Sequence, residues 1–204
     1  MCSLDTSRWD LAALARSWQR AAPFPHLVID DLFSPEDAQA ITDDLGEEPC
    51  ALVHDQIFEI YASTPSVLEG HALVSFRDEL GTGPVRAALH AITGIEVSRL
   101  DMRAFAYHRG HYLLPHTDRD ADDDTGRALA YTYYAPTPAP VTGGQLELFD
   151  CELRDGEIIS TSPAVLIEPR PNRLVLFEVG PHSLHQVREV EHGIRLSLAG
   201  WFFR

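Results

Sequence analysis

One short stretch carries two residue types that can bind a metal ion together. His116 and Asp118 stand two positions apart, at the end of an apolar and aromatic run that covers 102–114. Side chains two positions apart on an extended strand project to the same face. An imidazole and a carboxylate would therefore lie side by side as two ligands of one metal. A His-x-Asp pair alone is common, so this interpretation depends on a third ligand elsewhere in the chain.

A third ligand is available late in the chain, at His185. Arg195 follows ten residues later, inside an alternating segment, 193–197, that is typical of a strand. A metal held by two histidines and one carboxylate, with open positions opposite, is the arrangement of non-haem Fe(II) oxygenases. His182 lies three residues before His185 and is the alternative third ligand.

Composition narrows the class of protein. The 204 residues are 45% hydrophobic and 23% charged, which is ordinary for one soluble globular domain. The net charge is −15, and the sequence lacks the excess of basic residues that binds nucleic acid. DNA or RNA is therefore not expected as a partner. No apolar run approaches the length of a membrane span, and no signal-peptide pattern is present, so we expect no membrane partner and a cytoplasmic location.

Two smaller features fit the same picture. The three cysteines, Cys2, Cys50 and Cys151, are odd in number and form no Cys-x-x-Cys, which indicates free thiols in a reducing compartment. Five aspartates fall between Asp118 and Asp124. We interpret this run as a solvated loop, and the alternative is an acidic rim that favours a cationic substrate.

The chain divides into a helical part and a β-rich part. Periodic apolar residues and capping signals predict helices over 6–22, 34–45, 65–80 and 85–93, with a short β-rich run at 25–31 and a weak strand over 50–61. Beyond residue 97 no helix is expected. Nine short strands are predicted instead, at 98–107, 111–116, 128–134, 145–149, 157–160, 164–167, 174–178, 184–190 and 194–203. Many short strands indicate a sandwich or barrel, and the jelly-roll form also fits an internal metal site.

Taken together, these segments resemble the prolyl 4-hydroxylase-like branch of the Fe(II)- and 2-oxoglutarate-dependent dioxygenases. The similar segments occur in family order, at 23–30 with the helix start 34–36, then 112–118, 143–148, 171–177, 185–187 with 193–197, and 201–202. The resemblance implies an α+β fold, in which a double-stranded β-helix (jelly roll) carries N-terminal helices packed on it. We expect a single domain over 1–204, with 1–95 as a mainly helical buttress and 96–204 as the double-stranded β-helix.

The resemblance also implies the cofactors and the residue roles. Fe(II), 2-oxoglutarate and O2 would be used, and the arginine at plus ten favours His185 over His182 as third ligand. Arg195 would bind the far carboxylate of 2-oxoglutarate as a planar bidentate donor. A second hydrogen bond is expected from Ser197, which lies two positions along on the same face, and a tyrosine hydroxyl from Tyr107 or Tyr134. Arg103 is either a residue of the barrel mouth that meets a substrate carboxylate or a surface residue of its strand. In halogenating relatives a small residue replaces the metal-binding carboxylate, so Asp118 favours hydroxylation.

The expected activity is hydroxylation of an unactivated aliphatic carbon in an amino-acid-type substrate, a prolyl residue first, with release of succinate and CO2. A tailoring oxygenase that acts on a free amino acid or another natural-product intermediate is the first alternative. A nucleic-acid demethylase is disfavoured by the acidic charge, and a cupin-like binding protein is the non-enzyme alternative. The partner would be a small molecule or a peptide, and a homodimer through the N-terminal helices is possible. We expect 50–80 and 119–127 to cover the barrel mouth as loops or lids.

Overall fold

The computed structural model describes residues 4–65, 67–119 and 126–204. Five helical segments occur in these ranges: η1 (Thr6–Arg8), α1 (Leu11–Arg20), α2 (Pro35–Glu47), α3 (His71–Leu80) and α4 (Gly83–Thr93). The first strands are β1 (His26–Ile29), β2 (Cys50–His54), β3 (Phe58–Ser63), β4 (Arg99–Leu100), β5 (Arg103–Tyr107), β6 (Tyr112–His116) and β7 (Arg127–Tyr134). The later strands are β8 (Thr142–Gly143), β9 (Leu146–Arg154), β10 (Glu157–Ile167), β11 (Arg173–Glu178), β12 (His185–Val187), β13 (Val190–His192) and β14 (Arg195–Phe203).

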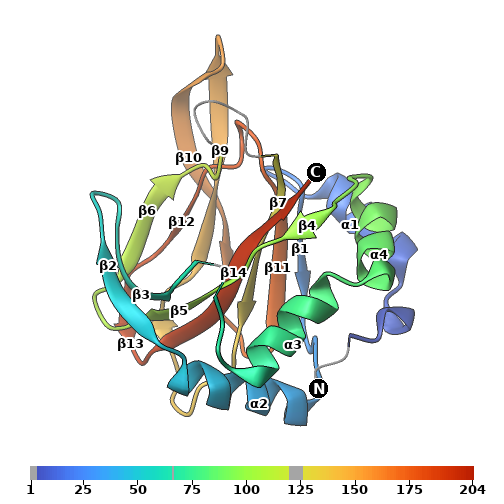
Figure 1. Cartoon of the computed structure of the whole chain (residues 1–204). Coiled ribbons are helices and arrows are strands. Elements are labelled where there is room, and N and C mark those ends of the chain that lie inside the picture. Colours follow the sequence, from blue (N-terminus) through green and yellow to red (C-terminus); the bar gives the residue numbers. More distant parts are fainter. Residues whose placement is uncertain (1–3, 66, 120–125) are drawn as a thin grey trace.

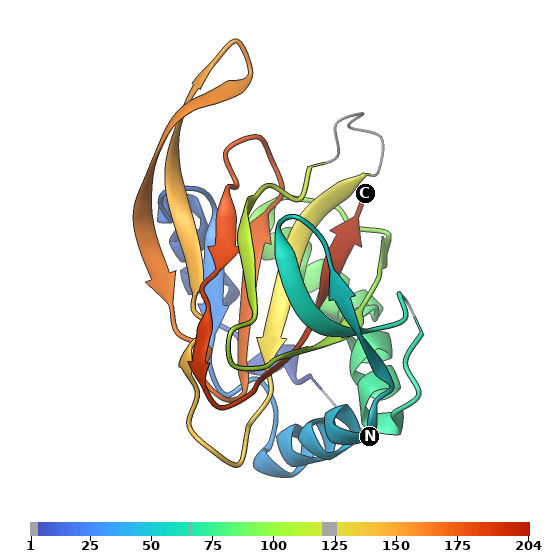
Figure 2. The same ribbon diagram turned by 90° about the vertical axis from the view of Figure 1, so that its left-hand side faces the viewer.

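Twelve strands form one antiparallel sheet that curls on itself (Figures 1 and 2). Its order is β1-β11-β7-β14-β5-β3-β6-β12-β9-β10, with β2 added beside β3 and β4 beside β14. Strand β3 pairs with both β5 and β6, so it joins the two halves of the curled sheet. The predicted jelly-roll core with N-terminal helices packed on it is confirmed. The β9–β10 hairpin projects beyond the body in both views.

Alternation along β7 separates the helix side of the sheet from the inside of the barrel. Leu129, Tyr131 and Tyr133 belong to the large core that includes the helices. Ala130 and Tyr134 belong to a second apolar cluster, formed with strands β9 and β11. This division is the period-two consequence of a strand that is covered on both faces.

Helix α2 begins as the sequence predicts. The Ser34 hydroxyl accepts a hydrogen bond from the Asp37 amide at 3.1 Å, with Pro35 in the first turn. The helix was predicted to end at residue 45, before Gly46, but it continues through this glycine to Glu47. A glycine ends a helix when it turns to positive φ, and Gly46 is not among the glycines that do.

Helix α3 starts six residues later than predicted, at His71 instead of Pro65. The backbone amides at the start of α3 have no acceptor within the helix. They donate instead to side chains from the C-terminal end of α2. The Asp44 carboxylate accepts from the Ala72 amide at 2.6 Å, and the Glu48 carboxylate accepts from the Gly70 amide at 3.0 Å. Glu48 is buried, and this hydrogen bond gives its carboxylate a polar partner there. Caps supplied from a distant segment leave no local sequence signal.

The segment 50–80 is ordered structure in its described part. Strands β2 and β3 form a hairpin whose inner face contributes Val53 and Phe58 to the wall of the central cavity, and α3 packs in the main core. The segment is therefore not a loop in its described part, whereas its place as a lid over the barrel mouth stays a prediction. Most of 119–127, including Asp120–Asp124, lies outside the described residues. No helix in the described part of the chain is both long and apolar enough to cross a membrane.

Gly143 should be essential for stability. Its φ is +75°, and a Cβ at this position would lie 2.1 Å from the Glu189 carbonyl oxygen. We expect Gly143→Ala to reduce the free energy of unfolding by about 2–4 kcal/mol, measured by denaturant titration. The control Gly46→Ala lies in a helix with open space around it and should instead stabilise by about 0.5–1 kcal/mol. Equal unfolding midpoints for the two variants would contradict this account of Gly143.

Candidate active site

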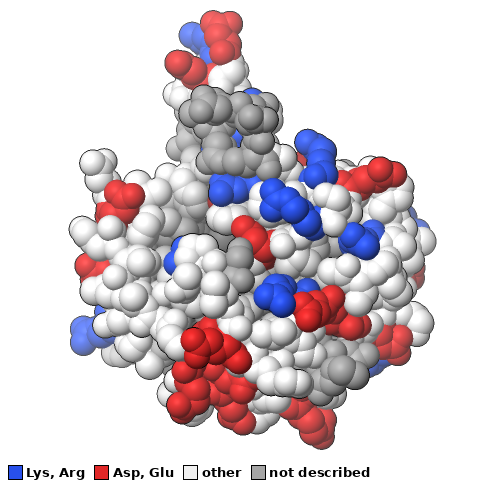
Figure 3. All heavy atoms as spheres, viewed as in Figure 1, with Lys and Arg blue, Asp and Glu red and all other residues white. Residues whose placement is uncertain are grey.

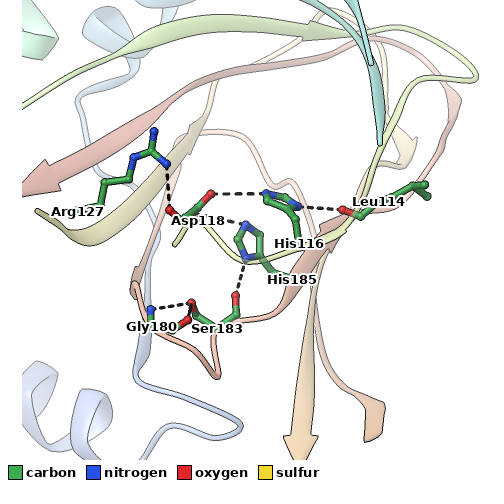
Figure 4. Close-up of polar contacts among 7 residues, drawn as sticks. All are labelled: Leu114, His116, Asp118, Arg127, Gly180, Ser183 and His185. Carbon is green, nitrogen blue, oxygen red and sulfur yellow. Dashed lines mark hydrogen bonds and ion pairs between the residues drawn. The ribbon is translucent and has the colours of Figure 1, made fainter. Parts of the chain in front are cut away.

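Strand pairing brings the three predicted metal ligands together. His116 ends β6 and stands directly opposite His185 on the neighbouring strand β12, and Asp118 follows His116 by two residues. The His116 Nε2 lies 3.6 Å from Asp118 Oδ1, and the His185 Nε2 lies 3.7 Å from Asp118 Oδ2 (Figure 4). These separations are too long for hydrogen bonds. They suit neighbouring ligands of one ion, since each bond to a transition metal is about 2 Å long.

Both imidazoles are held with the same nitrogen towards the site. The Nδ1 of His116 contacts the Leu114 carbonyl at 2.9 Å, and the Nδ1 of His185 contacts the Ser183 carbonyl at 2.8 Å (Figure 4). A carbonyl can only accept, so each Nδ1 must carry the proton and donate. Each Nε2 then has a free lone pair that faces Asp118. Such a second hydrogen bond fixes the tautomer and the ring orientation of metal-binding histidines.

The neighbouring histidines favour the ionised form of the Asp118 carboxylate. Burial opposes the charged form of Asp118, but the neighbouring His185 and His116 outweigh it and lower its pKa to about 2. Burial lowers the pKa of His185, which keeps this imidazole neutral. Burial acts the same way on His116, but Asp118 outweighs it and raises the pKa of this imidazole. The set therefore offers the negative charge that a divalent cation needs, and a bound cation would displace the proton that Asp118 favours on His116.

The three ligands line a cavity of about 510 Å³ inside the curled sheet. Its walls are mainly apolar, with Ile60, Leu146 and Phe177 among the lining residues. Arg195 and Ser197 also line it, from strand β14. The predicted metal ligands therefore share one cavity with Arg195, Ser197 and Tyr107, whereas Tyr134 is not among its lining residues.

Arg195 is a buried cation that pairs with no carboxylate of the described residues. Only 3% of it is exposed, and none of the ion pairs formed by the described residues includes it. Its Nη1 donates to the Ser197 hydroxyl at 3.3 Å, while its Nε has no hydrogen-bond partner in the described structure. A buried charge of this kind is costly unless a ligand compensates it. The far carboxylate of 2-oxoglutarate fits this requirement.

Two tyrosine rings flank that guanidinium. Its central carbon lies 4.6 Å from the ring centre of Tyr107 and 4.7 Å from that of Tyr134. The Tyr134 hydroxyl is buried and has no partner among the described residues, whereas Tyr131 and Tyr133 donate to Asp101 and Asn172. Burial raises the pKa of Tyr107, so its hydroxyl stays protonated and can donate. Cosubstrate binding by Tyr107, Tyr134 and Ser197 stays a prediction.

Arg103 lies on the cavity wall but is already partly engaged. Its Nε and Nη2 donate to the Ser63 carbonyl at 2.9 and 2.6 Å. This bond ties β5 to the end of β3, so the side chain has a structural role in addition to its place in the cavity. Its contact with substrate stays a prediction.

Two further lining residues were not anticipated from the sequence. The Arg127 Nη1 donates to the Asp118 carbonyl at 3.0 Å (Figure 4). Its guanidinium stacks 3.8 Å above the centre of the Trp201 ring. Arg127 thereby fixes the backbone of a metal ligand. Trp201 shares the parity of Arg195 on strand β14, so counting by two from Arg195 would have placed it on the inner face.

A curled antiparallel sheet that holds a group of two histidines and one carboxylate is the arrangement of a non-haem iron oxygenase. A model of the 2OG-Fe(II) oxygenase superfamily matches residues 102–203, and the chain belongs to this superfamily. Fe(II) and 2-oxoglutarate are the cofactors of that family, as expected from the sequence.

The chain is similar to several prolyl hydroxylases. It is 29% identical to the prolyl 3,4-dihydroxylase OGFOD1 of Ostreococcus tauri, over 88% of this chain and 38% of that protein. It is 32% identical to the prolyl 3-hydroxylase OGFOD1 of Mus musculus, over 89% of this chain and 33% of that protein. The chain thus spans about a third of the length of these curated relatives.

Solved structures support the same fold. A prolyl-4-hydroxylase of Pseudomonas putida matches with a TM-score of 0.72 at 22% identity, covering 95% of this chain and 98% of that one. A prolyl hydroxylase of Trichoplax adhaerens, in complex with a hypoxia inducible factor peptide fragment, matches with a TM-score of 0.69 at 14% identity, covering 95% and 88% of the two chains. At these identities the likeness establishes the fold alone.

Proposed function

We propose that this protein hydroxylates an aliphatic carbon of a prolyl residue in a peptide, using Fe(II), 2-oxoglutarate and O2 and releasing succinate and CO2. The observation that carries the proposal is the buried Arg195, which forms no ion pair with the described residues and shares the cavity with His116, Asp118 and His185. A structural metal site would not require a buried cation with an open bonding position beside it. A cosubstrate with a free carboxylate does require one.

The residues of this chain have distinct tasks in that reaction. His116, Asp118 and His185 would hold Fe(II), and Arg195 would hold the far carboxylate of 2-oxoglutarate. When bound, the iron and its cosubstrate supply the oxidant that converts a C–H bond to an alcohol. The apolar cavity wall excludes water from this oxidant. Arg127 keeps the Asp118 backbone in place through its hydrogen bond to the carbonyl.

A peptidyl substrate is favoured by the relatives. The similar curated proteins are named prolyl hydroxylases, and the Trichoplax adhaerens structure holds a peptide fragment. A free amino acid would compete for the same cavity and is therefore included in the test below.

The substrate proposal can be tested by mass spectrometry. Purified protein with Fe(II) and 2-oxoglutarate should add one oxygen to prolyl peptides, in amounts that match the succinate released. The same peptides with proline replaced by alanine are the control. Hydroxylation of free proline or another amino acid, with none of the peptides modified, would replace the peptidyl substrate by a small molecule. Oxygen added equally to the alanine peptides would contradict a prolyl target.

A further inference from the structure

A second carboxylate, Asp101, lies on the wall of the catalytic cavity without being a metal ligand. Its position is tightly fixed. The Asp101 amide donates to the Trp201 carbonyl at 3.1 Å, and its own carbonyl accepts from the Tyr131 hydroxyl at 2.6 Å. Its Oδ1 accepts from the Trp201 amide at 2.7 Å. A Cβ on residue 200 would lie 2.3 Å from the Asp101 carbonyl oxygen. Glycine at this position therefore allows the two backbone segments to approach each other closely.

The Asp101 carboxylate still has bonding capacity. Its Oδ2 makes no hydrogen bond within the described residues, and none of the ion pairs found there includes Asp101. Three arginines line the same cavity, and the hydrogen bonds that we observe from Arg103, Arg127 and Arg195 go to groups other than the Asp101 carboxylate. Arg103 donates to the Ser63 carbonyl and Arg127 to the Asp118 carbonyl. Burial raises the pKa of Asp101, while the Trp201 amide and the charge of Arg127 act against this rise.

Substrate binding would change the hydration of the Asp101 carboxylate. A half-buried carboxylate keeps part of its hydration through the open cavity, and a substrate that fills the cavity removes this water. Desolvating a carboxylate without giving it a partner is costly. A substrate that supplies a positively charged donor would avoid that cost, and one that lacks it would be rejected.

The charge of the whole protein acts in the same direction. The net charge is −15, and Figure 3 shows acidic side chains gathered over α2 on the face in view. A strongly negative protein attracts cationic segments and speeds their encounter. The short-range acceptor and the long-range field therefore favour the same kind of partner.

We propose that Asp101 is a specificity residue that binds an arginine or lysine side chain next to the hydroxylated residue of a peptide substrate. This inference rests on the proposed prolyl hydroxylation and names its substrate class more closely. Asp101 would accept hydrogen bonds from the guanidinium or ammonium group through Oδ2, with Oδ1 kept on the Trp201 amide. The enzyme would then prefer basic prolyl segments to neutral or acidic ones.

The test uses a neutral prolyl peptide in which a single arginine, or a glutamine, is placed in turn at each flanking position. Binding to the protein loaded with Fe(II) and 2-oxoglutarate is measured by calorimetry without oxygen, and kcat/KM is measured with oxygen. At one or more positions, arginine should improve both affinity and kcat/KM by on the order of 10- to 100-fold over glutamine. Glutamate there should weaken binding.

The variant Asp101→Asn keeps the acceptor for the Trp201 amide and removes the charge. It should reduce the preference for arginine over glutamine to within about 3-fold. Asp150→Asn, on an exposed part of β9, makes the same change in net charge and should keep the full preference. The melting temperature and iron content of both variants should match those of the wild type.

Each outcome has a separate meaning. If wild-type protein binds arginine and glutamine peptides equally, or if Asp101→Asn retains the preference, the role of Asp101 is refuted. If arginine-dependent binding needs Asp101 but no peptide is hydroxylated at proline, the specificity role stands and the prolyl target is wrong. The binding measurement thus distinguishes the two failures.

Discussion

Replacing His185 by alanine is expected to abolish succinate formation from 2-oxoglutarate and to reduce Fe(II) affinity by at least about 100-fold. His185 contributes one of three ligands, and its Nε2 is directed at Asp118 by the hydrogen bond from Nδ1 to the Ser183 carbonyl. Two remaining ligands cannot hold the ion in a fixed position. Metal content after gel filtration and succinate release in the presence of Fe(II) measure the two effects.

A matched control lies three residues away. His182 is exposed and lies outside the metal-binding group, so His182→Ala should keep both iron content and turnover. If His182→Ala lost iron while His185→Ala retained it, the third ligand would be misassigned. Equal iron content in wild type and His185→Ala would remove the basis for the metal site.

Arg195→Lys is expected to raise the KM for 2-oxoglutarate by about 10- to 100-fold while iron content stays normal. Lysine keeps the positive charge but lacks the planar pair of donors that a carboxylate accepts. A lysine side chain would also lack the flat guanidinium that stacks between the rings of Tyr107 and Tyr134. Steady-state kinetics with varied 2-oxoglutarate, at saturating Fe(II), measure the change.

The exposed Arg170 provides the comparison for this substitution. Arg170→Lys should leave the KM for 2-oxoglutarate unchanged. An unchanged KM in Arg195→Lys would mean that the cosubstrate is held elsewhere. A parallel loss of iron would mean that the substitution disturbs the metal site instead of cosubstrate binding.

The metal site was predictable because its parts obey local rules. The two-residue spacing of His116 and Asp118 fixes their common face. The choice of His185 over His182 as third ligand came from the resemblance, through the arginine ten residues later. The parity of β7 likewise separated Tyr134 from Tyr131 and Tyr133. In each of these cases the period of the strand determines the direction of the side chain.

Other features depend on contacts between distant segments, which local patterns do not encode. The start of α3 is set by Asp44 and Glu48 from the α2 region, so the proline at position 65 gave a misleading signal. Asp101 gains its place from Trp201, a hundred residues later in the chain. Arg127 reaches back to the Asp118 carbonyl across an intervening segment. Such contacts become visible only in the folded chain.

The most direct test of the central claim uses isotopically labelled oxygen. Protein with Fe(II), 2-oxoglutarate and a prolyl peptide is supplied with ¹⁸O₂, and both products are analysed by mass spectrometry. The account predicts one labelled atom in succinate and one in the hydroxylated peptide, in equal amounts, with neither product labelled in the His185→Ala variant. Succinate and hydroxylated peptide that carry no label, or label that persists in His185→Ala, would contradict it.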